Sequence, residues 1–196
     1  MQRDRDRLKG FAYFENFREL EAWSEHDVDP LQKANIPLQL RASRDGVDHG
    51  KSNVMLIHDY AGGYHDYESS QGGRVETELY SCDYLQYVET FVYFSHKLVA
   101  IPPPTWTDPL HRNGVKVLGT FIVEPGDLPV QRMLEAKDGI YWVANKLSQM
   151  AKCYGFDGWL INIEKAFPLL SWSSSRLEDF LKQLRAELGS QRKLVW

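Results

Sequence analysis

Five short hydrophobic runs, each followed by polar or glycine-rich residues, predict buried strands. They are residues Val54–His58, Phe91–Phe94, Val115–Val123, Gly158–Glu164 and Lys193–Trp196. Each run is almost continuously apolar, which is typical of parallel strands that are covered on both faces.

Hydrophobic residues also recur at helical spacing in two segments between the later runs. In residues 141–154 and 175–188 the apolar positions form one stripe along the expected helix: Val143, Leu147, Met150 and Ala151 in the first, and Leu177, Phe180, Leu181, Leu184 and Leu188 in the second. Ser175, with Glu178 three residues later, predicts a capping box at the start of the second helix.

Strands that alternate with helices predict an α/β fold with a parallel sheet. Two architectures fit this order, an open doubly wound sheet and a closed (β/α)8 TIM barrel. The chain has no Gly-x-Gly-x-x-Gly loop, and long loops rich in Gly or Pro, such as Ile101–Trp106, follow the first two strands, so the barrel is favoured. A barrel of about 250 residues has eight strands, whereas these 196 residues contain about five. We therefore expect a partial barrel, from a truncated product or a short isoform.

Composition and charge exclude several classes of protein. The net charge is −4 and no basic patch occurs, so no nucleic-acid partner is expected. The start, MQRDRDRLKG, is not a signal peptide, and no apolar run approaches the roughly 18 residues that cross a membrane, so no membrane partner is expected. Only two cysteines, Cys82 and Cys153, are present, and Asn-x-Ser/Thr sequons are absent. These features favour a cytosolic location.

The candidate chemistry centres on Phe156–Glu164. Side chains alternate along a strand, so Asn162 and Glu164 share one face, roughly 7 Å apart. Glycoside hydrolysis usually requires two carboxylates, but one acid and one amide suffice when the 2-acetamido oxygen of N-acetylglucosamine attacks its own anomeric carbon. In the alternative interpretation, this polar pair only satisfies loop backbone groups.

Other polar residues follow the predicted strands. His58–Asp59 and His65–Asp66 could be metal ligands or hydrogen-bonded structural groups; their spacing matches no known site, so we expect no metal and no cofactor. Trp106, in an expected exposed loop, could stack on a sugar or cap the core. Glu124 could contact substrate or be a charge at a helix start.

Four stretches of the chain resemble glycoside hydrolase family 85, the endo-β-N-acetylglucosaminidases. The first joins His58–Asp59 to Gly62–Tyr64, and the others are Phe91–His96 running to Ile101–Pro103, His111–Val115 with Val117–Ile122 and Glu124, and Phe156–Glu164. The resemblance covers roughly residues 53–196. Residues 1–41 match only loosely, around Leu20–Trp23, so we expect residues 1–41 to form an N-terminal segment and residues 42–196 the first portion of the catalytic barrel.

The resemblance implies a retaining enzyme that cleaves the β-1,4 bond within the N,N'-diacetylchitobiose core of N-glycans. Glu164 would be the acid/base, and Asn162 would orient the 2-acetamido group. The substrate-binding candidates are Tyr64, Trp106, Glu124, His58 and His96. The implied partners are N-glycans of glycoproteins, glycopeptides and free oligosaccharides.

Two alternatives to this activity stay open. One is a glycan-binding chain without turnover. The other is a barrel glycosidase that acts on chitin-like chains, although such enzymes usually carry an acidic residue where Asn162 stands.

Overall fold

The computed structural model describes residues 10–41, 53–72, 79–126, 128–168 and 173–196. The first nine residues of the expected N-terminal segment lie outside these ranges. The expected boundary between residues 41 and 42 falls where the described residues stop, before residues 42–52.

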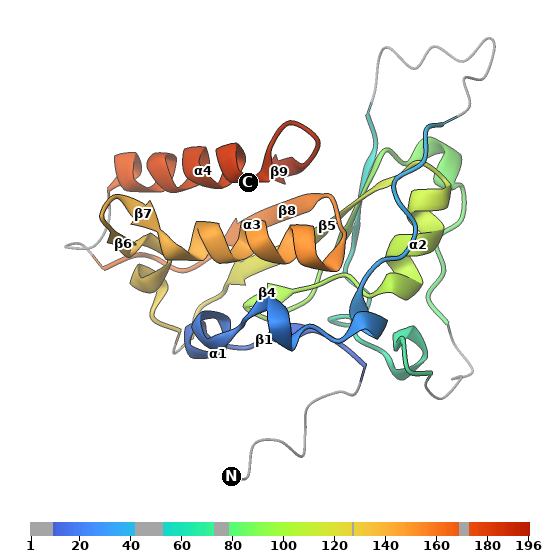
Figure 1. Ribbon diagram of the computed structural model, residues 1–196, viewed down its shortest axis with the longest axis horizontal. Coiled ribbons are helices and arrows are strands. Elements are labelled where there is room, and N and C mark those ends of the chain that lie inside the picture. The colour runs from blue at the N-terminus through green and yellow to red at the C-terminus, as the bar shows by residue number, and fades with distance from the viewer. Residues whose placement is uncertain (1–9, 42–52, 73–78, 127, 169–172) are drawn as a thin grey trace.

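Five parallel strands form the centre of the fold (Figure 1). They are β2 (Met55–His58), β3 (Thr90–Tyr93), β5 (Lys116–Val123), β8 (Gly158–Ile163) and β9 (Lys193–Val195). They pair in chain order, β2 with β3, β3 with β5, β5 with β8 and β8 with β9. All five predicted strands are thus confirmed, with their ends correct to within one residue. The sequential order lacks the reversal that characterises a doubly wound sheet.

Two further strands pair antiparallel beside β5. Along one edge of β5, the first residues pair with β3 and the later residues pair with β4 (Val99–Ala100). Strand β1 (Tyr13–Phe14) pairs in turn with β4. The sequence did not indicate these strands, because a two-residue strand has no measurable periodicity. They make the sheet mixed.

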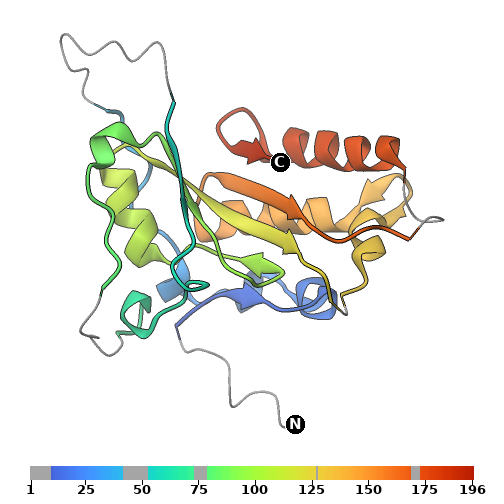
Figure 2. The ribbon, with the colours of Figure 1, turned by 180° about the vertical axis from the view of Figure 1, so that it is seen from behind.

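In the described ranges, four helices pack around the strands: α1 (Phe17–Ala22), α2 (Pro104–Arg112), α3 (Trp142–Tyr154) and α4 (Ser174–Leu188). Helices α3 and α4 lie side by side over one face of β5 and β8, and the strands lie in front of α3 when seen from behind (Figure 2). The connections contain short 3-10 turns and a hairpin: η1 (Glu25–Asp27), η2 (Pro30–Gln32), η3 (Asp66–Glu68), η4 (Leu85–Tyr87), η5 (Val130–Leu134), β6 (Ala136–Lys137) and β7 (Ile140–Tyr141). None of the helices in the described ranges has the length and apolar character needed to cross a bilayer.

The two predicted helices are confirmed, with one correction to a cap and one to a loop. Ser173, not Ser175, caps α4, since its hydroxyl accepts a hydrogen bond from the Arg176 amide. The segment expected as an exposed loop up to Trp106 becomes helical at Pro104. Proline is favoured in a first helical turn, where its missing N–H would have no partner.

Residues of the N-terminal segment pack into the main core. Phe17, Leu20 and Trp23 share one buried cluster with Phe121 of β5 and Leu147 of α3. The described part of residues 10–41 is therefore continuous with the core of the sheet.

Candidate active site

Strand β8 is positioned by two glycines at its start. Gly155 ends α3 in the left-handed conformation, with φ of 79°. A Cβ atom on Gly158 would lie 1.8 Å from the carbonyl oxygen of Lys193, so only glycine allows β9 to pair here. The glycine in the Phe156–Glu164 motif thus serves the approach of the neighbouring strand.

The alternation of β8 places its polar residues on the face away from the helices. Trp159, Ile161 and Ile163 belong to the core formed with α3 and α4. Asn162 and Glu164 therefore lie on the opposite face, at the carboxyl end of the strand. The Nδ2 of Asn162 donates a hydrogen bond of 2.9 Å to Oε1 of Glu164, and both groups are accessible to solvent.

A second polar group lies beside this pair, and we refer to Asp59, His96 and Glu124 as the His96 cluster. Nδ1 of His96 lies 2.8 Å from Oε1 of Glu124, and its Nε2 lies 3.6 Å from Oδ1 of Asp59. The hydrogen bond to Glu124 and the charges of the nearby carboxylates, Glu164 included, raise the pKa of His96. Protonation of His96, which lies between the carboxylates of Glu124 and Asp59, is therefore favoured relative to that of a free imidazole.

The structure thus brings together four of the predicted site residues, which come from the ends of three different strands. His96 follows β3, Glu124 follows β5, Asn162 lies in the last two residues of β8, and Glu164 follows that strand. Such an arrangement can donate and accept protons at Glu164 and can bind a polyhydroxylated ligand through several fixed hydrogen-bonding groups.

Asp59 belongs to this site, although the sequence indicated it only as a possible metal ligand or structural group and not as a substrate-binding residue. It follows His58 at the end of β2, where consecutive side chains point to opposite faces. Two polar residues at the end of a predicted strand indicated that one of them could belong to the site. The sequence did not indicate whether His58 or Asp59 would face it. Among the residues that the structure describes, no group of His, Cys, Asp and Glu side chains could hold a metal ion.

His58 lies on the other face of the sheet, apart from the Asn162–Glu164 pair. Its side chain is 0% exposed and contacts the rings of Tyr60, Phe91 and Trp106. Burial lowers the pKa of His58, although its Nε2 lies 3.6 Å from the Glu68 carboxylate. His58 is therefore a neutral, packed side chain.

Glu68 is the centre of this buried cluster. Its carboxylate accepts hydrogen bonds from Tyr93 Oη and Trp106 Nε1, both at 2.7 Å, and from the His65 amide at 3.0 Å. Burial alone would raise its pKa, but these hydrogen bonds, with His58, hold the pKa of Glu68 below its usual value. The Glu68 carboxylate therefore stays ionised although it is buried against the face of the sheet that lies opposite the Asn162–Glu164 pair.

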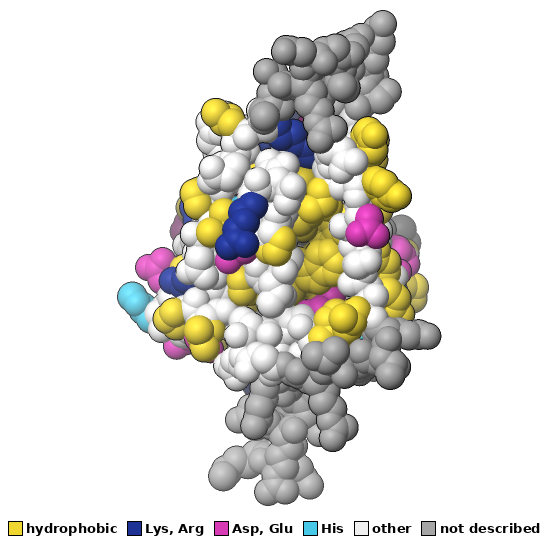
Figure 3. Space-filling model, turned by 90° about the vertical axis from the view of Figure 1, so that its right-hand side faces the viewer, with side chains coloured by type: hydrophobic (Ala, Val, Ile, Leu, Met, Phe, Trp, Pro, Cys, Tyr) yellow, Lys and Arg dark blue, Asp and Glu magenta, His cyan; other side chains and the backbone are white. Residues whose placement is uncertain are grey.

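Tyr64 and Trp106 also lie in this region. Tyr64 is 4% exposed, and its hydroxyl group lies within hydrogen-bond distance of the carbonyl oxygens of Ala12 and Ile101. Trp106 is half-buried on α2 and lines a pocket of about 270 Å³ beside that helix. Hydrophobic side chains gather in a hollow on this side of the molecule (Figure 3). The structure does not bring these two aromatic residues together with Asn162 and Glu164, which favours a supporting role over the predicted contact with substrate.

Comparison with known proteins relates the chain to one enzyme family. The family model "Glycosyl hydrolase family 85" matches residues 64–196. A protein of Gallus gallus named cytosolic endo-beta-N-acetylglucosaminidase is 38% identical over 90% of this chain and 24% of its own length. The Homo sapiens protein of the same name is 37% identical over 96% of this chain and 25% of its own length. The chain therefore spans about a quarter of the length of these relatives.

A solved structure has a similar fold. The glycoside hydrolase domain of Endo-D from Streptococcus pneumoniae superimposes with a TM-score of 0.75 and 26% sequence identity. The superposition covers 93% of this chain and 30% of that one.

Proposed function

Because this chain belongs to glycosyl hydrolase family 85, we propose that it carries the catalytic residues of an endo-β-N-acetylglucosaminidase. Its reaction would be hydrolysis of the β-1,4 bond between the two core N-acetylglucosamines of an N-glycan. The single observation that carries this proposal is the hydrogen bond between Asn162 and Glu164 at an open strand end. The names of the relatives support both the reaction and a cytosolic location.

The proposed mechanism uses the substrate's own acetamido group as the nucleophile. Glu164 donates a proton to the glycosidic oxygen as the bond to the anomeric carbon breaks, and the acetamido oxygen forms a new bond to that carbon. Water then opens the resulting oxazolinium ion, and Glu164 takes the proton of the water. Two displacements at one carbon retain its configuration.

Asn162 would orient the acetamido group during the first step. Since its Nδ2 donates to Glu164, its Oδ1 is left to accept a hydrogen bond from the acetamido N–H. That contact would place the acetamido oxygen below the anomeric carbon and increase its nucleophilicity. An amide also avoids a second negative charge beside the acid that must carry a proton.

The His96 cluster is proposed to bind sugar hydroxyls next to the reacting bond. His96 and Glu124 are about half-exposed and are held in a fixed geometry by their mutual hydrogen bond. His58, Tyr64 and Trp106 would act at a distance, by supporting the loops that follow β2 and β3. The substrates would be N-glycans on glycoproteins and glycopeptides, and free oligosaccharides.

We also propose that the sheet is part of a (β/α)8 barrel. The five parallel strands pair in sequential order, and helices α3 and α4 cover one face while the polar site lies on the other. In a barrel the catalytic groups lie at the carboxyl ends of the strands, where Asn162 and Glu164 stand.

Incubation with a Man₉GlcNAc₂ glycopeptide, followed by mass spectrometry, tests the proposed reaction. Release of a glycan with one reducing N-acetylglucosamine is expected, and binding without release would instead support the glycan-binding alternative. Glu164→Gln should lower the hydrolysis rate by about 10²- to 10⁴-fold, the usual contribution of a general acid/base, while the fold is kept. Glu135→Gln, at an exposed position away from β8, is the matched control. Unchanged hydrolysis by Glu164→Gln would disprove the assignment.

Asn162→Gln separates the two proposed roles. It should slow hydrolysis of the glycopeptide, because the longer side chain misplaces the acetamido group. A preformed sugar oxazoline should still be accepted, since its ring is already closed. Equal losses on both substrates would argue against the orienting role of Asn162.

A further inference from the structure

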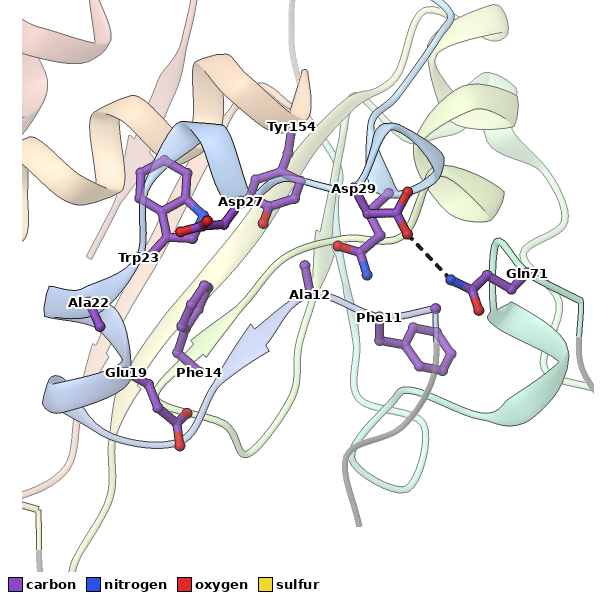
Figure 4. A pocket seen from close by; sticks show the side chains of 12 residues that line it. Phe11, Ala12, Phe14, Glu19, Ala22, Trp23, Asp27, Asp29, Gln71 and Tyr154 are labelled. Carbon is purple, nitrogen blue, oxygen red and sulfur yellow. Dashed lines mark hydrogen bonds between the residues drawn. The ribbon is translucent and has the colours of Figure 1, made fainter. Parts of the chain in front are cut away.

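A groove of about 570 Å³ lies between the N-terminal segment and the end of α3 (Figure 4). Its walls include the aromatic rings of Phe14, Trp23 and Tyr154 and the carboxylates of Asp27 and Asp29. None of the candidate active-site residues lines it. Its volume lies within the range of small-ligand sites.

The indole N–H of Trp23 is buried in the groove wall without a hydrogen-bond partner in the described part of the chain. The side chain is 6% exposed. The indoles of Trp106 and Trp159 are, by contrast, bonded to Glu68 Oε1 at 2.7 Å and to the Leu147 carbonyl at 2.9 Å. A buried donor without an acceptor is destabilising and is uncommon in folded proteins.

Hydrogen-bond acceptors line the same groove. The carboxylate of Asp27 is exposed and has no hydrogen bond to another described residue, and it lies on the same side of the groove as the Trp23 indole in Figure 4. Asp29 accepts from the Leu31 amide at 2.9 Å and from Nε2 of Gln71 at 3.3 Å, which places a side-chain amide on the opposite wall. The groove thus presents donors and acceptors together.

The buried indole N–H and the nearby carboxylates together indicate which class of ligand the groove can bind. An ammonium ion would satisfy the carboxylates but would leave the indole N–H without an acceptor. An anion would accept from the indole but would be repelled by Asp27 and Asp29. A hydroxyl group can accept from Trp23 and donate to Asp27 at once, and the C–H groups of a sugar ring can contact the edges of the aromatic side chains, which are 4–6% exposed.

We propose that this groove is a carbohydrate-binding site, in which a neutral sugar bridges Trp23 Nε1 and the Asp27 carboxylate. Most of its residues precede residue 64, where the match to the family model begins. The site does not depend on the proposed catalytic function, because it shares no residue with the Asn162–Glu164 pair.

Titration of the full chain with two glycans, Man₉GlcNAc and chitotriose, tests the site. Indole N–H resonances in a ¹H–¹⁵N spectrum report the contact directly. At least one glycan should shift the Trp23 signal saturably, while the Trp159 signal, whose N–H is already bonded, should stay in place. Shifts at Trp159 alone, or no saturable shift at Trp23 with either glycan, would overturn the proposal.

Two variants identify the binding groups, and two more serve as controls. Trp23→Phe keeps a ring but removes the donor, and Asp27→Ala removes the acceptor; each should weaken glycan binding at least tenfold without lowering glycopeptide hydrolysis. Glu25→Ala, an exposed acid in the same 3-10 turn that does not line the groove, is the control and should bind normally. Glu164→Gln should bind at the groove normally even where hydrolysis is lost, which separates this site from the proposed active site. Normal affinity in both groove variants, or preferential binding of spermidine over the glycans, would show that the groove is not a sugar site.

Discussion

The imidazole of His111 and the carboxylate of Asp157 lie 2.7 Å apart, between Nε2 and Oδ2, at the amino end of the parallel strands. The other ring nitrogen of His111 contacts the Ile36 carbonyl at 2.6 Å. Oδ2 of Asp157 also accepts from the Val117 amide at 2.8 Å. This pair therefore connects α2, β5, β8 and the N-terminal segment, far along the strands from the Asn162–Glu164 pair.

We predict that Asp157→Asn lowers the free energy of unfolding by about 2 kcal/mol, because the neutral amide loses the ion pair with His111 and the charge that strengthens both hydrogen bonds. Urea unfolding followed by circular dichroism measures the change. Asp179→Asn, at an exposed position on α4, is the control and should change stability by no more than about 0.5 kcal/mol. Equal effects of the two variants would contradict a structural role for the pair.

The same pair predicts how stability depends on pH. Burial opposes the charge of His111, but the Asp157 hydrogen bond and charge outweigh it and raise the pKa of His111 in the folded protein. The stabilisation is complete below the unfolded pKa of about 6.5 and is lost as the pH rises through the folded pKa. Urea unfolding of the wild type should therefore show a fall in stability above about pH 6.5.

His111→Gln isolates this contribution, since glutamine can still donate to Asp157 but does not titrate. The difference in unfolding free energy between the wild type and His111→Gln should shrink as the pH rises above about 6.5. A difference that stays constant from pH 6 to pH 9 would mean that the His111 charge does not stabilise the fold.

Gly158→Ala should prevent the normal pairing of β9. The added methyl group would lie 1.8 Å from the Lys193 carbonyl oxygen, and neither this Cβ atom nor the backbone oxygen can move away by a change of side-chain rotamer. Gly139→Ala is a matched control, because its φ of 78° is also positive but nothing lies within 4 Å of the new methyl group. The control should cost roughly 1–2 kcal/mol, the strain of the left-handed conformation, and Gly158→Ala should cost clearly more. Equal urea midpoints would refute the close approach.

Trp106→Phe distinguishes a supporting role from a sugar contact. Loss of the hydrogen bond to the Glu68 carboxylate should lower the free energy of unfolding by about 1.5–3 kcal/mol, the usual contribution of a hydrogen bond to a charged group. The KM for the glycopeptide should stay unchanged, because the ring lies apart from Asn162 and Glu164. A raised KM with normal stability would support the sugar-stacking interpretation of Trp106 instead.

Much of the central sheet could be predicted from local pattern. The apolar runs that became β2, β3, β5, β8 and β9 are bounded by polar or glycine-rich residues, so their ends were correct to within one residue. The alternation within Phe156–Glu164 also placed Asn162 and Glu164 on one face before any fold was known. These features depend only on residues adjacent in the chain, whose geometry a strand dictates.

Tertiary structure alone decided which face of β2 turned toward the site. Met55, Leu56 and Ile57 are equally apolar, so the sequence carried no signal that His58 would be buried against Phe91 and Asp59 would reach His96. The same is true of the Trp106 indole, whose partner Glu68 lies 38 residues away. Such choices depend on contacts between distant segments, and they are made only when those segments pack together.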